Sequence, residues 1–152
     1  QWMFVRVSKK IEQACGILII LAEHHNSPVT NFELNQRLDM SLSYLMKLTR
    51  RLVKKGIIIS TKGVSGGFVL AKSMREITLL MVVEAIEGTE PSFTKSELIQ
   101  KVLKDKPQIA QKVMQALENS FATAERAWRS ELDKVTMESL VKLSLEGGKN
   151  DD

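Results

Sequence analysis

The sequence predicts a mainly α-helical protein with a small two-stranded β-hairpin, and three observations lead to this fold class. Apolar residues recur at steps of three and four through most of the 152 residues, as they do in amphipathic helices. A glycine-rich stretch at 60–71 separates two short runs of β-branched and aromatic residues, which is typical of a β-hairpin. One helical pattern then continues from 108 to about 134, which is long for a domain of this size.

Residues 8–56 predict three helices, and a tight turn joins the last two. After an apolar helix over 8–25, Thr30 and Glu33 have the spacing of a capping box, which predicts the start of a short helix. Ser41 then follows a turn and can cap a third helix that ends at Gly56. A short helix, a tight turn and a longer helix are typical of a helix-turn-helix.

The third helix has an apolar side and a basic side. Its leucines share one side and should pack inward, whereas polar and basic residues step by four, three and four along the opposite side. The first turns of such a helix enter the major groove of DNA, and long basic side chains reach phosphates. The inward leucines are Leu45, Leu48 and Leu52. The expected DNA contacts are Ser41, Ser43, Tyr44, Met46, Lys47, Arg50, Arg51 and Lys54.

Positive charge is concentrated around this helix. Residues 40–62 hold six basic residues and no acidic residue, within a chain of net charge +4. Such a patch attracts polyanions, most often nucleic acid and less often an anionic membrane surface. By charge alone, a solvated helix face explains the patch equally well.

The glycine-rich stretch follows the basic helix directly and is interpreted as a wing. A phosphate-cradling nucleotide loop would have to open a helix, and here a strand follows instead. Glycines let a hairpin approach the DNA backbone closely, and a lysine at its tip can lie along the minor groove. The alternative is an ordinary hairpin that only needs positive φ angles. The expected wing contacts are Lys62, Gly63, Ser65, Gly66 and Gly67.

The chain divides into three segments. A helix over 76–88, which Thr78 can cap, completes a winged helix-turn-helix domain at 1–88. Residues 89–107 form a linker with a short helix over 96–106. Residues 108–146 hold a long dimerisation helix and a closing helix.

The long helix carries one apolar stripe that a globule of this size does not cover. A second copy of the chain, in a two-fold contact, is the simplest partner for this stripe. The alternative is a kinked helix that folds back on its own core. The residues expected at the dimer interface are Leu117, Phe121, Ala124, Trp128 and Leu132.

No residue pattern indicates catalysis. Nucleophiles, histidines and carboxylates lack the spacing of a catalytic or metal-binding set, so we expect no enzyme activity, metal or cofactor. Cys15, the single cysteine, is best explained as a small buried residue, with a thiol sensor as the alternative. The apolar run at 16–22 is too short to span a bilayer, and cysteine scarcity fits a reducing compartment, so we expect a cytoplasmic protein without a membrane partner.

Four motifs together resemble the Rrf-two family of bacterial winged-helix transcriptional regulators. They are "SLSYL" at 41–45, "KKGIIIS" at 54–60, "KGVSGGFVLA" at 62–71 and "EITLLMVVEAIEG" at 76–88. The resemblance implies a homodimeric transcription factor. It also implies that the recognition helix begins with Ser41, Ser43 and Tyr44, and that Lys62 and Gly63 to Gly67 form the wing.

Three departures from the family pattern limit what the resemblance implies. Met46 stands where the family often has a Glu that could accept a hydrogen bond from cytosine, and Lys62 stands where Arg is common. Cluster-binding members place three cysteines after the motif that ends in "EG", whereas residues 89–110 contain none. We therefore expect no iron–sulfur cluster.

The sequence therefore predicts a sequence-specific DNA-binding regulator, a repressor that acts as a homodimer on a roughly palindromic operator. Two alternatives stay open: a protein-interaction module that binds a partner enzyme, and a thiol-based redox sensor that uses Cys15. A small-molecule effector is open as a further partner. The operator, the regulated genes and the inducing signal have no signature in the sequence.

Overall fold

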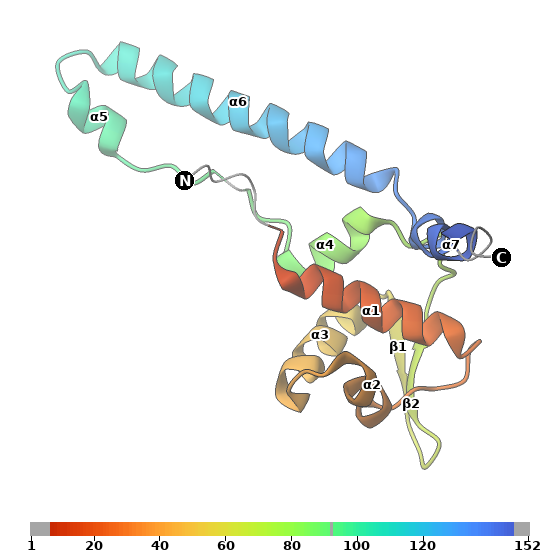
Figure 1. Ribbon diagram of the computed structural model, residues 1–152. Coiled ribbons are helices and arrows are strands. Elements are labelled where there is room, and N and C mark those ends of the chain that lie inside the picture. Colours follow the sequence, from red (N-terminus) through yellow and green to blue (C-terminus); the bar gives the residue numbers. More distant parts are fainter. Residues whose placement is uncertain (1–6, 92, 148–152) are drawn as a thin grey trace. The chain divides into compact units, whose positions relative to one another are not determined.

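The computed structural model describes residues 7–91 and 93–147, and the chain forms two compact units (Figure 1). The first, called here the winged-helix unit, comprises the described residues up to Gly88 together with residues 133–147. The second, called the α5–α6 unit, runs from Thr89 to Leu132.

The winged-helix unit begins with three helices whose first turns are capped by side chains. These are α1 (Lys9–Glu23), α2 (Asn31–Leu38) and α3 (Leu42–Lys54). The capping box predicted for α2 is confirmed, because Glu33 N donates to Thr30 Oγ1 at 3.1 Å and Thr30 N donates to Glu33 Oε2 at 2.7 Å. Ser41 caps α3 as predicted, accepting from Tyr44 N at 3.3 Å.

A two-stranded antiparallel hairpin follows α3. Strand β1 (Ile58–Thr61) pairs with β2 (Gly67–Leu70) in the register Ile58 to Leu70 and Thr61 to Gly67. Phe68 also exchanges two backbone hydrogen bonds with Val29, of 2.8 and 3.0 Å, so the hairpin is attached to the segment that leads into α2. The loop between the strands projects from this unit (Figure 1).

The winged-helix unit is closed by α4 (Leu79–Glu87) and α7 (Met137–Gly147). The sequence groups the closing helix with the long helix in one segment, but in the structure the closing helix belongs to the winged-helix unit. Leu79 N donates to Val135 O at 2.8 Å, and Met137 N donates to Ile77 O at 2.8 Å. Met137 is fully buried, so its burial together with these backbone bonds holds α7 in this unit.

The core lies where α1, α3 and α4 pack together against the base of the hairpin. The three leucines that the helical spacing directs inward are all buried, with exposures of 1% or less. Burying a side chain of this size contributes about 1.5–3 kcal/mol. Other fully buried side chains are Ile17, Leu18, Val29, Leu34, Ile57, Ile58, Ile77 and Val82.

The α5–α6 unit contains a short helix and a long one, α5 (Leu98–Val102) and α6 (Pro107–Asp133). Proline suits the first position of a helix because its missing N–H has no partner there. Only Ala110 and Met114 of α6 are buried. The ring of Phe93 stacks on that of Phe121, with centroids 5.0 Å apart, so one residue of the apolar stripe already has a partner in its own chain.

Candidate nucleic-acid interface

The outer side of α3 presents the basic stripe that the sequence predicts. Lys47, Arg50 and Lys54 are exposed, and within the described part of the chain their side chains have no hydrogen-bond or ion-pair partner. The buried leucines fix this orientation, because they hold the opposite side of the helix in the core. Three cationic groups are thus free to contact phosphates along about two turns of one helix.

The serines at the start of α3 differ in what they can offer to DNA. The Ser41 hydroxyl is used as the helix cap, whereas the exposed Ser43 hydroxyl lies 3.5 Å from that of Ser41. Tyr44 is half-buried beside them. Ser43 is therefore the freer of the two serines for a base edge or a phosphate.

Arg51 differs from the other basic residues of the helix. Its Nη1 donates a 2.7 Å hydrogen bond to the carbonyl oxygen of Ile86, near the end of α4. A charged donor on a helix-terminal carbonyl is favourable, because that end of the helix carries partial negative charge. Arg51 therefore joins α3 to α4, a role that the sequence pattern does not reveal.

The wing loop is exposed at Lys62, Gly63 and Ser65, as expected for a contact surface. At positions 66 and 67, close packing also requires glycine. A Cβ on Gly66 would lie 2.7 Å from Thr61 O, and one on Gly67, where φ is +156°, would lie 2.6 Å from the backbone of Val29. These two glycines therefore permit the turn and the attachment of the hairpin, whatever the loop binds.

Other residues near α3 were not found from the sequence. Leu42, in the first turn of α3, is 49% exposed, beside Met46 at 41%. A pocket of about 240 Å³ lies between α2, α3 and the hairpin. Leu42 could have been identified from the sequence, because it directly follows the capping serine. The pocket could not, because residues far apart in the sequence line it. The pocket is lined by Asn31, Met46, Thr49, Arg50, Val53, Ser60 and Phe68.

Cys15 lies half-buried in α1. Burial raises the pKa of its thiol, and the nearby Glu12 carboxylate raises that pKa further. A reactive cysteine needs a lowered pKa, because the thiolate is the nucleophile. The environment of Cys15 thus favours a structural residue over a redox sensor.

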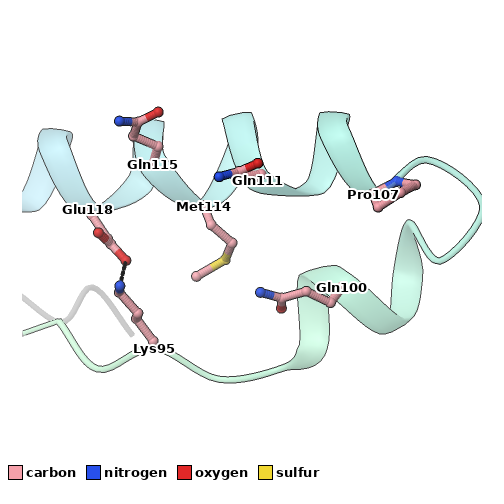
Figure 2. Close-up of a pocket in the computed structure, with 7 residues that line it drawn as sticks. All are labelled: Lys95, Gln100, Pro107, Gln111, Met114, Gln115 and Glu118. Carbon is pink, nitrogen blue, oxygen red and sulfur yellow. Dashed lines mark ion pairs between the residues drawn. The ribbon is translucent and has the colours of Figure 1, made fainter.

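The α5–α6 unit has a polar pocket of about 330 Å³ between its two helices. Figure 2 shows Met114 and Gln100 directed into it, and an ion pair of 2.7 Å between Lys95 Nζ and Glu118 Oε1 at one end. An exposed pair of this kind contributes little to stability. Gln111 and Gln115 also line the pocket.

Neither a metal site nor a membrane span is found in the described ranges, 7–91 and 93–147. No group of three or more His, Cys, Asp or Glu residues lies close enough there to hold a metal ion. No helix in the same ranges has the length and apolar character needed to cross a bilayer.

A helix-turn-helix with a free basic stripe, followed at once by a hairpin, defines the class of winged-helix DNA-binding regulators. The particular family follows from sequence comparison. The model of the Rrf2 family, described as an iron-dependent transcriptional regulator, matches residues 7–143. The chain therefore belongs to the Rrf2 family, the same Rrf-two family that its motifs resemble. It is a DNA-binding transcriptional regulator and not an enzyme.

Curated relatives carry the same description. YwgB of Bacillus subtilis (strain 168), described as an HTH-type transcriptional regulator, is 32% identical over 124 residues, which are 80% of each chain. IscR of Pectobacterium carotovorum is 36% identical over 84 residues, 55% of this chain and 51% of IscR. The chain thus matches about half the length of IscR and lacks the three cysteines expected of cluster-binding members.

Solved structures share the fold. The T. potens IscR structure superposes with a TM-score of 0.65 at 23% identity, covering 94% of this chain and 90% of that one. CymR, the global cysteine regulator of B. subtilis, gives a TM-score of 0.61 at 22% identity, covering 92% of this chain and 98% of that one. At these identities the likeness shows the fold alone, and it confirms the predicted fold class.

Proposed function

We propose that this regulator binds its operator as a homodimer, with α3 in the major groove and the wing loop at the adjacent minor groove. The observation that carries the proposal is the set of three exposed basic side chains on α3, which have no partner in the described part of the chain. The homodimer would act in the cytoplasm as a repressor by occupying a roughly palindromic site. Its half-sites would be about 34 Å apart, one turn of DNA.

Within this proposal, phosphate contacts and base contacts fall to different residues. Lys47, Arg50, Lys54 and Lys62 supply charge, and Arg51 adds to them although its Nη1 is already engaged. Ser43, Tyr44 and Met46 would contact base edges, while Ser41 mainly fixes the start of the helix. Gly63 to Gly67, with Ser65, bring the wing backbone close to the DNA.

Dimerisation is proposed through α6, whose apolar stripe is half-buried at Leu117, Trp128 and Leu132 and exposed at several other positions. Ile109 and Phe121 are 48% and 47% exposed, and Ala124 is exposed. A two-fold contact along this helix would cover the stripe in both copies. The interface would comprise Leu117, Phe121, Ala124, Trp128 and Leu132.

The test compares two neighbouring arginines. Arg50→Ala should weaken binding to all DNA sequences alike and lower the salt slope of log Kd by about one, since one phosphate contact is lost. Arg51→Ala should mainly lower the free energy of unfolding, by about 1 kcal/mol, because it loses its bond to Ile86 O. Ser43→Ala should instead change sequence preference. An unchanged affinity and salt slope for Arg50→Ala would place the stripe away from DNA.

The protein-interaction module gives a different result in the same experiments. Such a module would bind DNA only without sequence preference and would co-purify with one partner enzyme. Passing sheared genomic DNA over the protein at about 0.2 M salt, where nonspecific binding is weak, separates the two. Enrichment of one inverted repeat supports the regulator, and its absence supports the module.

A further inference from the structure

The exposed surface of α3 carries an apolar ridge beside the basic stripe. Leu42, Met46 and Val53 follow one another at steps of four and seven, so they lie along one line of the helix. Their exposures are 49%, 41% and 36%. Single exposed apolar residues are ordinary on protein surfaces, but this ridge borders the basic stripe, with Arg50 one turn from both Met46 and Val53.

The first two members of the ridge lie where a groove-binding helix comes nearest to the bases. Leu42 occupies the first turn of α3, directly after the capping Ser41, and Met46 lies one turn later on the same side. In the major groove, the apolar group on a base edge is the 5-methyl group of thymine. Neither side chain offers a strong hydrogen-bonding group, and methionine sulfur is only a weak acceptor.

From this arrangement we infer that Leu42 and Met46 read thymine methyl groups, so that each operator half-site contains thymine opposite the start of α3. The inference rests on the proposed function, because it requires α3 to enter the major groove. The charge of residues 40–62, with six basic and no acidic residue, makes DNA the occupant that this face fits best. Val53 lies about two turns beyond Met46, near the end of α3, so it is not assigned a contact with the bases.

Replacing thymine by uracil tests the inference without knowledge of the operator. A library of random-sequence duplexes is first enriched on the wild-type protein at about 0.2 M salt. The enriched pool is then amplified twice, once with thymidine and once with deoxyuridine triphosphate. The second pool has the same sequences, phosphates and hydrogen-bonding groups but lacks every thymine methyl. Wild-type affinity should fall by about fourfold for each methyl that is buried on binding.

The variants assign that loss to the two side chains. Leu42→Ala and Met46→Ala should each bind the thymine pool more weakly and show a smaller ratio between the pools, whereas Met46→Leu should keep the ratio. Leu143→Ala, at a leucine of α7 that is 65% exposed, is the matched control and should behave as wild type. Thermal melting of each variant checks that it is folded.

Three results would overturn the inference, and they can be told apart. Equal wild-type affinity for the two pools would show that methyl groups are not read, although specific binding stands. A ratio unchanged in both alanine variants would show that the methyl groups act through DNA shape. Failure to enrich any sequence would contradict the proposed sequence-specific function itself, and the inference with it.

Discussion

The two units of the chain differ in how much of their apolar side chains they bury. In the winged-helix unit, leucines and isoleucines from several helices and the hairpin reach almost complete burial, and side chains cap the starts of α1 to α4. In the α5–α6 unit, Leu98, Val102 and Ile109 remain 63%, 68% and 48% exposed. The first unit is stabilised by its own core, whereas the second leaves these apolar side chains exposed.

The largest expected difference between the two units appears when one leucine in each is truncated. Leu48→Ala, at a leucine that is 1% exposed, should lower the free energy of unfolding by about 2–5 kcal/mol, since it leaves a cavity in the core. Leu98→Ala should change that free energy by less than about 0.5 kcal/mol. Urea unfolding followed by circular dichroism measures both. Equal losses would show that α5 is as tightly packed as the core of the winged-helix unit.

A second prediction concerns what covers the α5–α6 unit. Ala124→Arg places a long charged side chain on the apolar stripe of α6 and should convert a dimer of twice 17.1 kDa into a monomer. Ala122→Arg is the matched control, because Ala122 is also exposed but lies about 160° around the same helix. Sedimentation velocity at several concentrations gives the masses. Dimers in both variants, or a monomeric wild type, would remove α6 from the interface.

The sequence could predict those features that depend on residues close together in the chain. Thr30 with Glu33, Ser41 and Thr78 act within one turn of the chain, so their residue types alone predict the helix starts that are observed. The hairpin and the inward leucines follow from equally local periodicity.

Contacts between residues far apart in the sequence could not be predicted from a local pattern. The bond from Arg51 to Ile86, the stacking of Phe93 on Phe121 and the attachment of Met137 each join segments at least 28 residues apart. From residue type and spacing, Arg51 was predicted to belong to the basic DNA-contacting set, and α7 was grouped with the long helix. Only the packed structure shows which neighbour each one meets.

A third prediction uses the single thiol to probe how closed the winged-helix unit is. Because burial raises the pKa of Cys15, less of it is thiolate at any pH below that value, and access is limited as well. Alkylation by iodoacetamide at pH 7.5 should be at least about tenfold slower in the folded protein than in urea. Mass spectrometry follows the reaction. Equally fast alkylation in both states would restore the reactive-thiol alternative.

The smallest expected effect lies at the capping box of α2. Hydrogen bonds from the backbone N–H and then the hydroxyl of Thr30 hold the pKa of Glu33 below its ordinary value of 4.5. A carboxylate whose pKa is lowered on folding stabilises the folded state above its unfolded pKa. That contribution is lost as the pH falls below 4.5 and through the folded pKa.

Glu33→Gln should therefore be slightly less stable than wild type at pH 7, and the difference should shrink toward pH 3. Urea midpoints at both pH values measure this, with Glu90→Gln in the α5–α6 unit as a control for removing a carboxylate. A difference that stays constant with pH would mean that shape, rather than charge, makes Glu33 the partner of Thr30.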